Sequence, residues 1–310
     1  MNKLYILGNG FDLWHGLPTA YKCFNCYVHR VHPTKHERIG RIFNRIDSNI
    51  LWTDYEDMLS KIDIVKLVEN NIETWSKCKD ICEVENAFDS LYNDLMWLFH
   101  KWVLQIDYSM AFEKRLVLDK EAAFLNFNYT NTLERLYGIC REKICYIHGD
   151  TSDNSLYQPV VGHGESSIER IIYPLIEDVC KIVNSYKKFP QWAQSPCAFL
   201  HDILEIIKTF LYDLQKKTAY YIQENNGWFT RLDDIKDIFV LGHSLAEVDA
   251  PYFKSIYYES PKATWHVSCF GEKEKYNNKQ KLCDLLDVSQ KNINIELFTL
   301  DDLELKNERC

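Results

Sequence analysis

Six short apolar runs, separated by segments with helical periodicity, constrain the fold of this chain more than any other feature. A strand that pairs in parallel with the next one needs a crossover connection, which is usually a helix. The alternation therefore predicts an α/β fold of three layers, in which helices cover both faces of a parallel sheet. The predicted strands are Leu4–Leu7, Ala122–Phe127, Ile144–Ile147, Ile238–Leu241, Thr264–Phe270 and Ile293–Thr299.

Two of the connections are far longer than a crossover requires. We interpret residues 35–120 and 151–235 as helical insertions in a single α/β domain that spans residues 1–310. The predicted helices are Ala20–His32, His36–Asp47, Tyr55–Leu67, Val84–Ile106, Thr132–Cys140, Ser167–Tyr186, Phe199–Gln223, Pro251–Tyr258 and Asn277–Asp287.

The composition narrows the classes of function. The net charge of -9 argues against a broad surface for nucleic acids. No window reaches the roughly 18 uncharged apolar residues of a membrane span, and the apolar run after Lys3 is too short for a signal peptide. We therefore expect a cytoplasmic protein that does not contact a membrane and whose 11 cysteines are reduced.

One group of residues has the chemistry of metal ligands, namely Cys23, Cys26, His29 and His32. On a continuous helix each step of three residues turns the side chain by about -60°, so that His32 lies opposite Cys23. Four such ligands do not converge on one ion, and no second cysteine pair has the spacing of a zinc site. We therefore expect no metal.

Glycines and polar residues gather where four of the predicted strands end. The carboxyl ends of parallel strands share one edge of the sheet, and ligands of open α/β sheets bind beyond that edge. The four strand ends together therefore predict a binding site. Its residues are Gly8-Asn9-Gly10-Phe11-Asp12, Asn126-Phe127-Asn128-Tyr129-Thr130, His148-Gly149-Asp150, and Gly242-His243-Ser244 with Asp249.

Each of these residue types has a functional and a structural interpretation. Gly8 and Gly10 let a phosphate approach the backbone, or they only turn the chain. Asn128 can orient a water or a ribose hydroxyl, or it caps the helix that starts near Thr132. His148 is a natural proton acceptor at neutral pH, or it is simply hydrogen-bonded in the interior. Taken jointly, they favour a site.

Several longer motifs resemble those of a known family. The stretches GNGFDLWHGLPTAY, WTDYEDML, FLNFNYTNTLERLYG, YIHGD and LGHSLAEVDAPYF are similar to the AbiH family of bacteriophage abortive-infection proteins, and they span residues 4 to 253. The resemblance implies a role in bacterial defence, in which phage multiplication is halted at the expense of the infected cell. It also implies a phage-derived trigger.

A more distant resemblance concerns the chemistry. The sirtuin-type NAD-binding fold, which is Rossmann-like, carries in the same order a glycine turn after strand one, a G-I-P-D-F-R loop, an Asn-bearing strand end, a His-Gly and a late G-x-S. The similar segments here are Gly8-Asn9-Gly10, Gly16-Leu17-Pro18-Thr19-Ala20-Tyr21, Phe127-Asn128-Tyr129-Thr130, His148-Gly149 and Gly242-His243-Ser244. Thr130 replaces the sirtuin Asp, Tyr21 replaces the Arg of the second loop, and the paired CxxC zinc module is absent.

These departures argue against a protein deacylase and leave hydrolysis of NAD as the implied activity. The resemblance implies that Asn128 and His148 are catalytic and that NAD is the substrate. The residues expected to bind it are Gly8, Asn9, Gly10, Phe11, Asp12, His15, Gly242, His243, Ser244 and Asp249. NADP or ADP-ribose derivatives remain alternative substrates, and analogy with sirtuin-like defence proteins implies a homo-oligomer.

Two other functions stay open. The stretch Val240-Leu241-Gly242-His243-Ser244-Leu245-Ala246 imitates the nucleophile elbow of an α/β-hydrolase, which would use Ser244 with Asp249 and His266. A nucleotide-binding sensor that does no chemistry would need the same glycines as an enzyme. It differs in that Asn128 and His148 would affect affinity alone.

Overall fold

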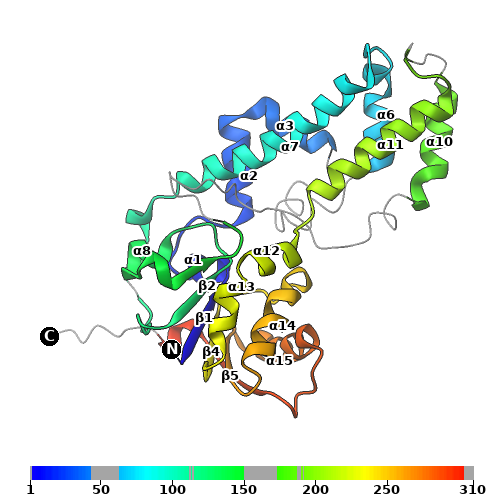
Figure 1. Ribbon diagram of the computed structural model, residues 1–310. Helices are drawn as coiled ribbons and strands as arrows, with labels where there is room; N and C mark the ends of the chain where they lie inside the picture. Colours follow the sequence, from blue (N-terminus) through cyan, green and yellow to red (C-terminus); the bar gives the residue numbers. More distant parts are fainter. Residues whose placement is uncertain are drawn as a thin grey trace. The chain divides into compact units, whose positions relative to one another are not determined.

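A computed structural model of the chain describes residues 2–42, 63–111, 113, 115–149, 173–186, 190 and 192–303 (Figure 1). The chain divides into two compact units. The first comprises Met1–Ala20, Val103–Val160 and Lys217–Cys310, and the second comprises Tyr21–Trp102 and Val161–Lys216. The segments predicted as insertions, residues 35–120 and 151–235, overlap the two parts of the second unit.

The first unit is built on a six-stranded sheet in the order β3-β2-β1-β4-β5-β6, and every pair of neighbours is parallel. The α/β class and all six predicted strands are confirmed. The strands are β1 Lys3–Leu7, β2 Ala123–Asn126, β3 Ile144–Tyr146, β4 Asp237–Leu241, β5 Thr264–Ser268 and β6 Asn294–Phe298. Leu7 of β1 lies opposite both Asn126 of β2 and Leu241 of β4. The strand order reverses at β1 and β4, which is the arrangement of doubly wound sheets.

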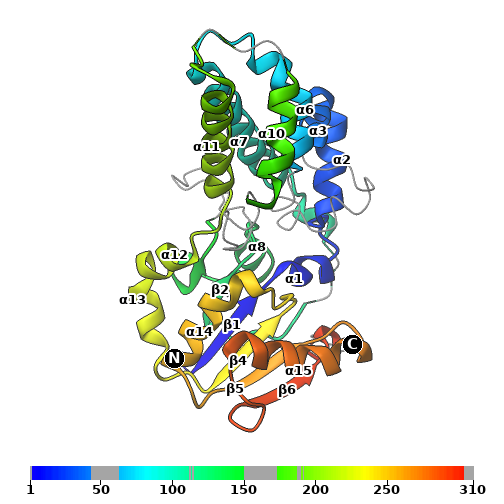
Figure 2. The same ribbon diagram turned by 90° about the vertical axis from the view of Figure 1, so that its right-hand side faces the viewer.

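One face of the sheet buries the even-numbered residues of β1 and β4, such as Ile6 and Val240. Tyr252 and Leu282, from the two helices seen in front of the sheet in Figure 2, pack on this face. The helices that contribute to this core are α12 Thr218–Glu224, α13 Asn226–Phe229, α14 Ala250–Glu259 and α15 Glu272–Leu286.

The opposite face buries Tyr5, Leu7 and Phe124 against Phe11 and Leu133. The elements on this side are short: helix α1 Asn9–Trp14, helix α8 Thr132–Tyr137 and the 3-10 turn Leu300–Leu303. Both faces of the sheet are therefore covered in the region around β1, as a parallel sheet requires.

The second unit is a group of helices whose aromatic side chains interlock. The rings of Phe24 and Phe99 lie 5.4 Å apart, and those of Phe88 and Phe210 lie 5.2 Å apart. These pairs join the helix that carries Phe24 to the one that carries Phe88 and Phe99, and that helix to the one that carries Phe210. The helices described in this unit are α2 Tyr21–Val31, α3 Pro33–Ile42, α6 Ile64–Trp75, α7 Ile81–Leu104, α10 Ile176–Ser185 and α11 Pro196–Asp213.

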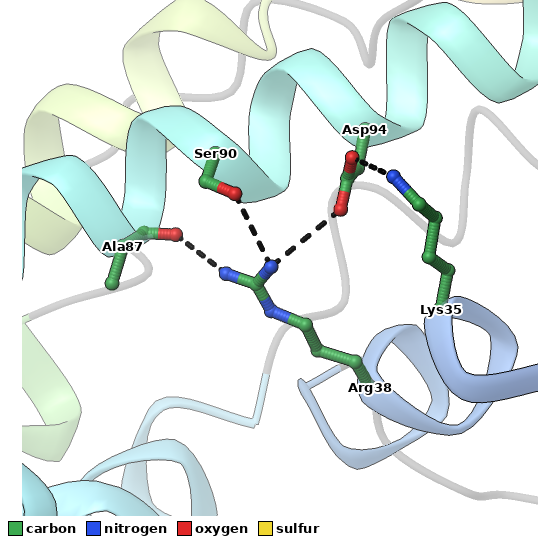
Figure 3. Close-up of polar contacts among 5 residues, drawn as sticks. All are labelled: Lys35, Arg38, Ala87, Ser90 and Asp94. Carbon is green, nitrogen blue, oxygen red and sulfur yellow. Dashed lines mark hydrogen bonds and ion pairs between the residues drawn. The ribbon is translucent and has the colours of Figure 1, made fainter.

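Polar contacts fasten α3 to α7 within this unit (Figure 3). Arg38 donates to the carbonyl of Ala87 at 2.7 Å and lies 3.5 Å from the carboxylate of Asp94. Lys35 pairs with the other oxygen of Asp94. One carboxylate thus holds two cations of the neighbouring helix, which favours one register between the two helices.

Three helix predictions need correction. No helix was predicted between Gly8 and Gly16, where the sequence indicated a turn at Gly8-Asn9-Gly10, but Asn9–Trp14 is helix α1. The predicted helix Phe199–Gln223 is two helices, because the chain passes from the second unit to the first between Lys216 and Lys217. The predicted helix Tyr55–Leu67 lies outside the described residues up to residue 62. In the described part, α6 begins at Ile64, and the side chain of Asp63 before it accepts a hydrogen bond from Lys66 N at 3.0 Å.

Among the described helices, none is long and apolar enough to cross a membrane.

Candidate functional site

The predicted site residues all belong to the first unit, and they follow the carboxyl ends of β1, β2, β3 and β4. The central relationship is between the turn after β1 and the turn after β4. Gly8 N donates to Leu241 O at 3.0 Å and Gly10 N donates to Gly242 O at 2.8 Å. This is the point where the strand order reverses, at which doubly wound sheets bind their ligands.

The glycines of these two turns are required by backbone packing. A Cβ atom on Gly10 would lie 2.7 Å from the carbonyl oxygen of Gly242, and one on Gly242 would lie 2.2 Å from the backbone nitrogen of Phe11. Gly242 also has a φ of +63°, which side chains rarely adopt. The packing explains these glycines whether or not a phosphate binds there, and phosphate binding stays a prediction.

Asn128 joins the end of β2 to the end of β1. Its Nδ2 donates to Gly8 O at 3.0 Å, and its backbone nitrogen donates to Oδ1 of Asn126 at 3.0 Å. No donor among the described residues reaches Oδ1 of Asn128, so this oxygen is the acceptor that the residue can offer to a ligand. The predicted alternative, a cap on the helix at Thr132, is wrong, because that helix has Asn131 at its N-cap position.

His148 lies two residues beyond β3 and is buried, with 1% of its surface exposed. Three aromatic rings surround its imidazole. The centroid distances are 5.2 Å to Phe127, 6.1 Å to Tyr129 and 5.9 Å to Tyr252. Ring packing of this kind restricts rotation of the imidazole and fixes the directions of its two nitrogens.

Asp249 brings His148 and His243 into one cluster. Its Oδ1 lies 3.9 Å from Nε2 of His148 and its Oδ2 lies 3.4 Å from Nε2 of His243. All three side chains are buried. The structure therefore brings together three residues that the sequence placed at two different strand ends.

The turn that carries His243 has an unusual backbone. Leu245 adopts a φ of 55°, a left-handed conformation that costs a branched side chain of order 1 kcal/mol or more. Its backbone nitrogen donates to Nδ1 of His243 at 3.0 Å, which stabilises the turn. Ser244, between these two residues, is exposed.

The α/β-hydrolase triad is not assembled. His266 lies 3.0 Å from Asp237 Oδ1 through Nε2 and 3.1 Å from Glu296 Oε2 through Nδ1. Asp249, which the triad would need beside His266, faces His148 and His243 instead. Ser244 therefore lacks the coupled acid and base that would activate it.

Asp12 and His15, predicted to close over a ribose, are engaged in the interior. Asp12 accepts hydrogen bonds from Thr130 Oγ1 at 2.5 Å and Thr132 Oγ1 at 2.7 Å. Burial raises the pKa of Asp12 to about 6, and the two threonine hydrogen bonds offset part of this rise. His15 contacts Phe11 O and the hydroxyl of Tyr137, each at 2.7 Å. These residues fasten α1 to the segment after β2.

Asn9 has a comparable local role. Its Nδ2 donates to Thr19 O at 3.1 Å and so ties the turn after β1 to the second turn of the same motif. Phe11 is fully buried, and its ring lies 5.9 Å from that of Tyr137. Asp150, at the end of the His-Gly-Asp motif, lies outside the described residues.

Two aromatic residues that pack against the histidines had no role assigned from the sequence: Phe127, which was only named within the strand-end motif, and Tyr252. Phe127 contacts both histidines, with ring centroids 5.2 Å from His148 and 4.5 Å from His243. Tyr252 contacts His148 and Phe127 from α14. Both residues lie inside motifs already singled out, but in sequence an aromatic residue that packs in the core cannot be told from one that packs against a histidine.

Within the described part of the chain, no three His, Cys, Asp or Glu side chains are grouped to hold a metal ion. Cys23, Cys26 and His29 lie on the continuous helix α2, and His32 follows it.

Comparison with known proteins identifies a family to which the chain is similar, but no individual protein that matches it. No curated protein and no solved structure matches the chain. The model of the family described as "Bacteriophage abortive infection AbiH" matches residues 4–269, which include every strand end described above. The chain therefore belongs to the AbiH family of bacteriophage abortive-infection proteins.

Proposed function

We propose that this protein is an abortive-infection effector that hydrolyses the nicotinamide–ribose bond of NAD when a phage infects the cell. Membership of the AbiH family supports the biological part of the proposal. The observation that carries the chemical part is the convergence of Asn128, His148 and the Gly8–Gly242 contact at the reversal point of a doubly wound sheet. That position is where such sheets bind nucleotides.

The reaction needs orientation and one proton acceptor. The bond between nicotinamide and C1′ of the ribose breaks, an oxocarbenium-like ribose forms, and a water oxygen bonds to C1′. His148 accepts the proton that the water loses. Asn128 orients the water or the neighbouring ribose hydroxyl through Oδ1, since its Nδ2 is held by Gly8 O.

The remaining predicted contacts complete the site. The turn of Gly8, Asn9 and Gly10 would border the pyrophosphate, although the backbone nitrogens of Gly8 and Gly10 already donate to Leu241 O and Gly242 O. Gly242, His243 and Ser244 would line the adenosine side. Phe11, Asp12 and His15 would act from the interior, by holding α1 in place, rather than by touching the ribose. No metal ion takes part in this proposal, and NAD enters as the substrate.

Purified protein incubated with NAD tests the proposal through the release of free nicotinamide, with and without lysate from phage-infected cells. We expect activated wild-type protein to release nicotinamide. His148→Ala should lower the rate by about 10²–10⁴-fold and still bind NAD, because it removes a general base and not a binding group. Equal cleavage by wild type, Asn128→Ala and His148→Ala would place the chemistry elsewhere.

A second function is favoured by the burial of the reactive side chains. His148 and Asn128 are only 1% and 6% exposed. In an enzyme, this arrangement requires a trigger that opens the site. In a sensor, the same residues would bind a nucleotide and transmit the change to a partner without turnover. Binding of NAD or ADP-ribose with no release of nicotinamide under any activating condition would favour the sensor.

A further inference from the structure

We propose that the hydroxyl of Thr19 is a ligand-binding group, which donates a hydrogen bond to an oxygen of the pyrophosphate of NAD. This inference rests on the proposed function, and it adds a residue to the site. The observation that carries it is a buried hydroxyl with no hydrogen-bond partner among the described residues.

The turn that contains Thr19 is attached to the turn after β1. Nδ2 of Asn9 donates to Thr19 O at 3.1 Å, and Thr19 N donates to Leu17 O at 2.8 Å. Leu17 N donates in turn to Asp12 O at 3.1 Å, so this second turn is anchored on helix α1. Both backbone groups of Thr19 are therefore bonded within the protein, and these bonds hold the residue beside Asn9.

The side chain of Thr19 is not satisfied in the same way. Thr19 is 6% exposed, and its Oγ1 is buried with no hydrogen-bond partner in the part of the chain that the structure describes. A buried hydroxyl without a partner costs free energy, so most such groups are bonded in folded proteins. The hydroxyls of the buried Thr130 and Thr132, by contrast, both donate to Asp12. An unsatisfied hydroxyl beside a strand-end site therefore indicates a group that bonds to a ligand.

The place of Thr19 in the site indicates which part of the ligand it meets. Asn9 ties Thr19 to the turn after β1, and Asn128 donates to Gly8 O of the same turn at 3.0 Å. In the proposed function this turn borders the pyrophosphate. Thr19 and Asn128 are equally buried, so the trigger that opens the site to NAD gives access to both side chains.

The turn after β1 needs a hydrogen-bond donor from another residue. The backbone nitrogens of Gly8 and Gly10 are not available to phosphate oxygens, because they already donate to the carbonyl oxygens of Leu241 and Gly242. A threonine hydroxyl has one proton to donate, and the charged oxygens of a pyrophosphate are strong acceptors. Thr19 thus supplies a donor that the glycine turn lacks.

Equilibrium dialysis of labelled ADP-ribose, with and without lysate from phage-infected cells, measures this contact without any turnover. ADP-ribose has the pyrophosphate of NAD but no nicotinamide. We expect Thr19→Val, which removes the hydroxyl and keeps the shape of the side chain, to raise the Kd by about 10–100-fold, the loss typical of a hydrogen bond to a charged group. Thr19→Ser keeps the hydroxyl and should restore most of the affinity.

The outcomes separate this inference from the proposed function. Equal binding of ADP-ribose by wild type and Thr19→Val overturns the role of Thr19 and leaves NAD hydrolysis standing. If Thr19→Val loses affinity as expected but wild type releases no nicotinamide from NAD, the proposed chemistry fails and the role of Thr19 stands. If wild type binds neither ADP-ribose nor NAD in either condition, both are overturned.

A second measurement tests the hydroxyl in the ligand-free protein. Because Thr19→Val removes a buried group that lacks a partner, it should melt at or above the temperature of wild type in calorimetry. Thr132→Val is the matched control, since it removes a buried hydroxyl that donates to Asp12 at 2.7 Å, and it should melt several degrees lower. Melting of Thr19→Val as far below wild type as Thr132→Val would show that the hydroxyl already has a partner, and this result overturns the inference whatever the binding data.

Discussion

Gly8 packs so closely on His243 that a Cβ atom at position 8 would lie 2.5 Å from the Cα atom of His243. Real Cβ atoms essentially never approach backbone so closely, so the two turns meet only because position 8 lacks a side chain. The first glycine motif and the histidine turn therefore form one structural unit. Gly8 and His243 are 235 positions apart in the sequence, but the strands that precede them, β1 and β4, are paired neighbours in the sheet.

Alanine at these glycines should destabilise the first unit. Gly8→Ala forces the turn after β4 to move, which typically costs about 1–3 kcal/mol, and Gly242→Ala adds the strain of a φ of +63°. We expect both variants to melt several degrees below wild type in calorimetry, with Gly242→Ala lower. Gly227→Ala is the control, because a Cβ atom there meets nothing within 4 Å. Unchanged melting of Gly242→Ala would contradict the packing.

The buried carboxylate of Asp12 should make stability depend on pH. Its pKa is 3.8 in the unfolded chain and about 6 in the folded one, so the folded state binds the proton more tightly. The stabilisation is full below about pH 4 and is lost as the pH rises through about 6, a change of about 3 kcal/mol. We expect Asp12→Asn to gain stability relative to wild type over this window, measured by denaturant unfolding at several pH values. The same comparison with Asp234→Asn, at an exposed position, should give no such trend.

The hydroxyl of Tyr137 should contribute more to the free energy of unfolding than the hydroxyl of an exposed tyrosine. It accepts from Leu116 N at 2.9 Å and lies 2.7 Å from Nε2 of His15. Nδ1 of His15 faces the carbonyl of Phe11 and so donates, which leaves Nε2 to accept the tyrosine proton. Tyr137→Phe should lower the free energy of unfolding by about 1–3 kcal/mol, because it removes the partner of two buried groups. Tyr258→Phe, at a side chain that is 82% exposed, should change it little.

Membership of the AbiH family predicts a measurable defence phenotype. Expression of the protein in a phage-sensitive bacterial host should lower the number of plaques relative to an empty vector, and infected cells should die without releasing progeny. The measurement is plating efficiency over a broad panel of phages, together with the survival of infected cells. Equal plating on both strains across the panel would contradict the defence role.

The sheet could be predicted from sequence because each strand is a local apolar run bounded by turn residues. The contacts within the site were harder to predict, because the residues that make them lie far apart in the sequence. Gly8, Asn128 and His148 could be placed at one edge from the rule that parallel strands end together. The partners of Asp12, by contrast, are Thr130 and Thr132, and nothing near position 12 indicates that its carboxylate turns towards β2 and not towards a ligand.

The same limit applies to Asp249. The sequence indicated a ligand-binding role for Asp249, and only the fold shows that its carboxylate faces two imidazoles. Helix α1 was missed for a related reason, since Gly8 and Gly10 are typical of a turn, whereas here they allow α1 to start against the backbone of Gly242. Long-range packing of backbone on backbone leaves no periodic signal.

The central claim is that NAD is cleaved by His148 during infection, and the NAD pool of infected cells tests it most directly. The trigger need not be known, because the phage supplies it. In cells that express wild type, we expect NAD to fall after infection while nicotinamide and ADP-ribose rise in equal amounts, and in cells that express His148→Ala we expect the pool and the plaque count to match the empty vector. Protection by wild type with an unchanged NAD pool, or full protection by a stably expressed His148→Ala, would contradict the account.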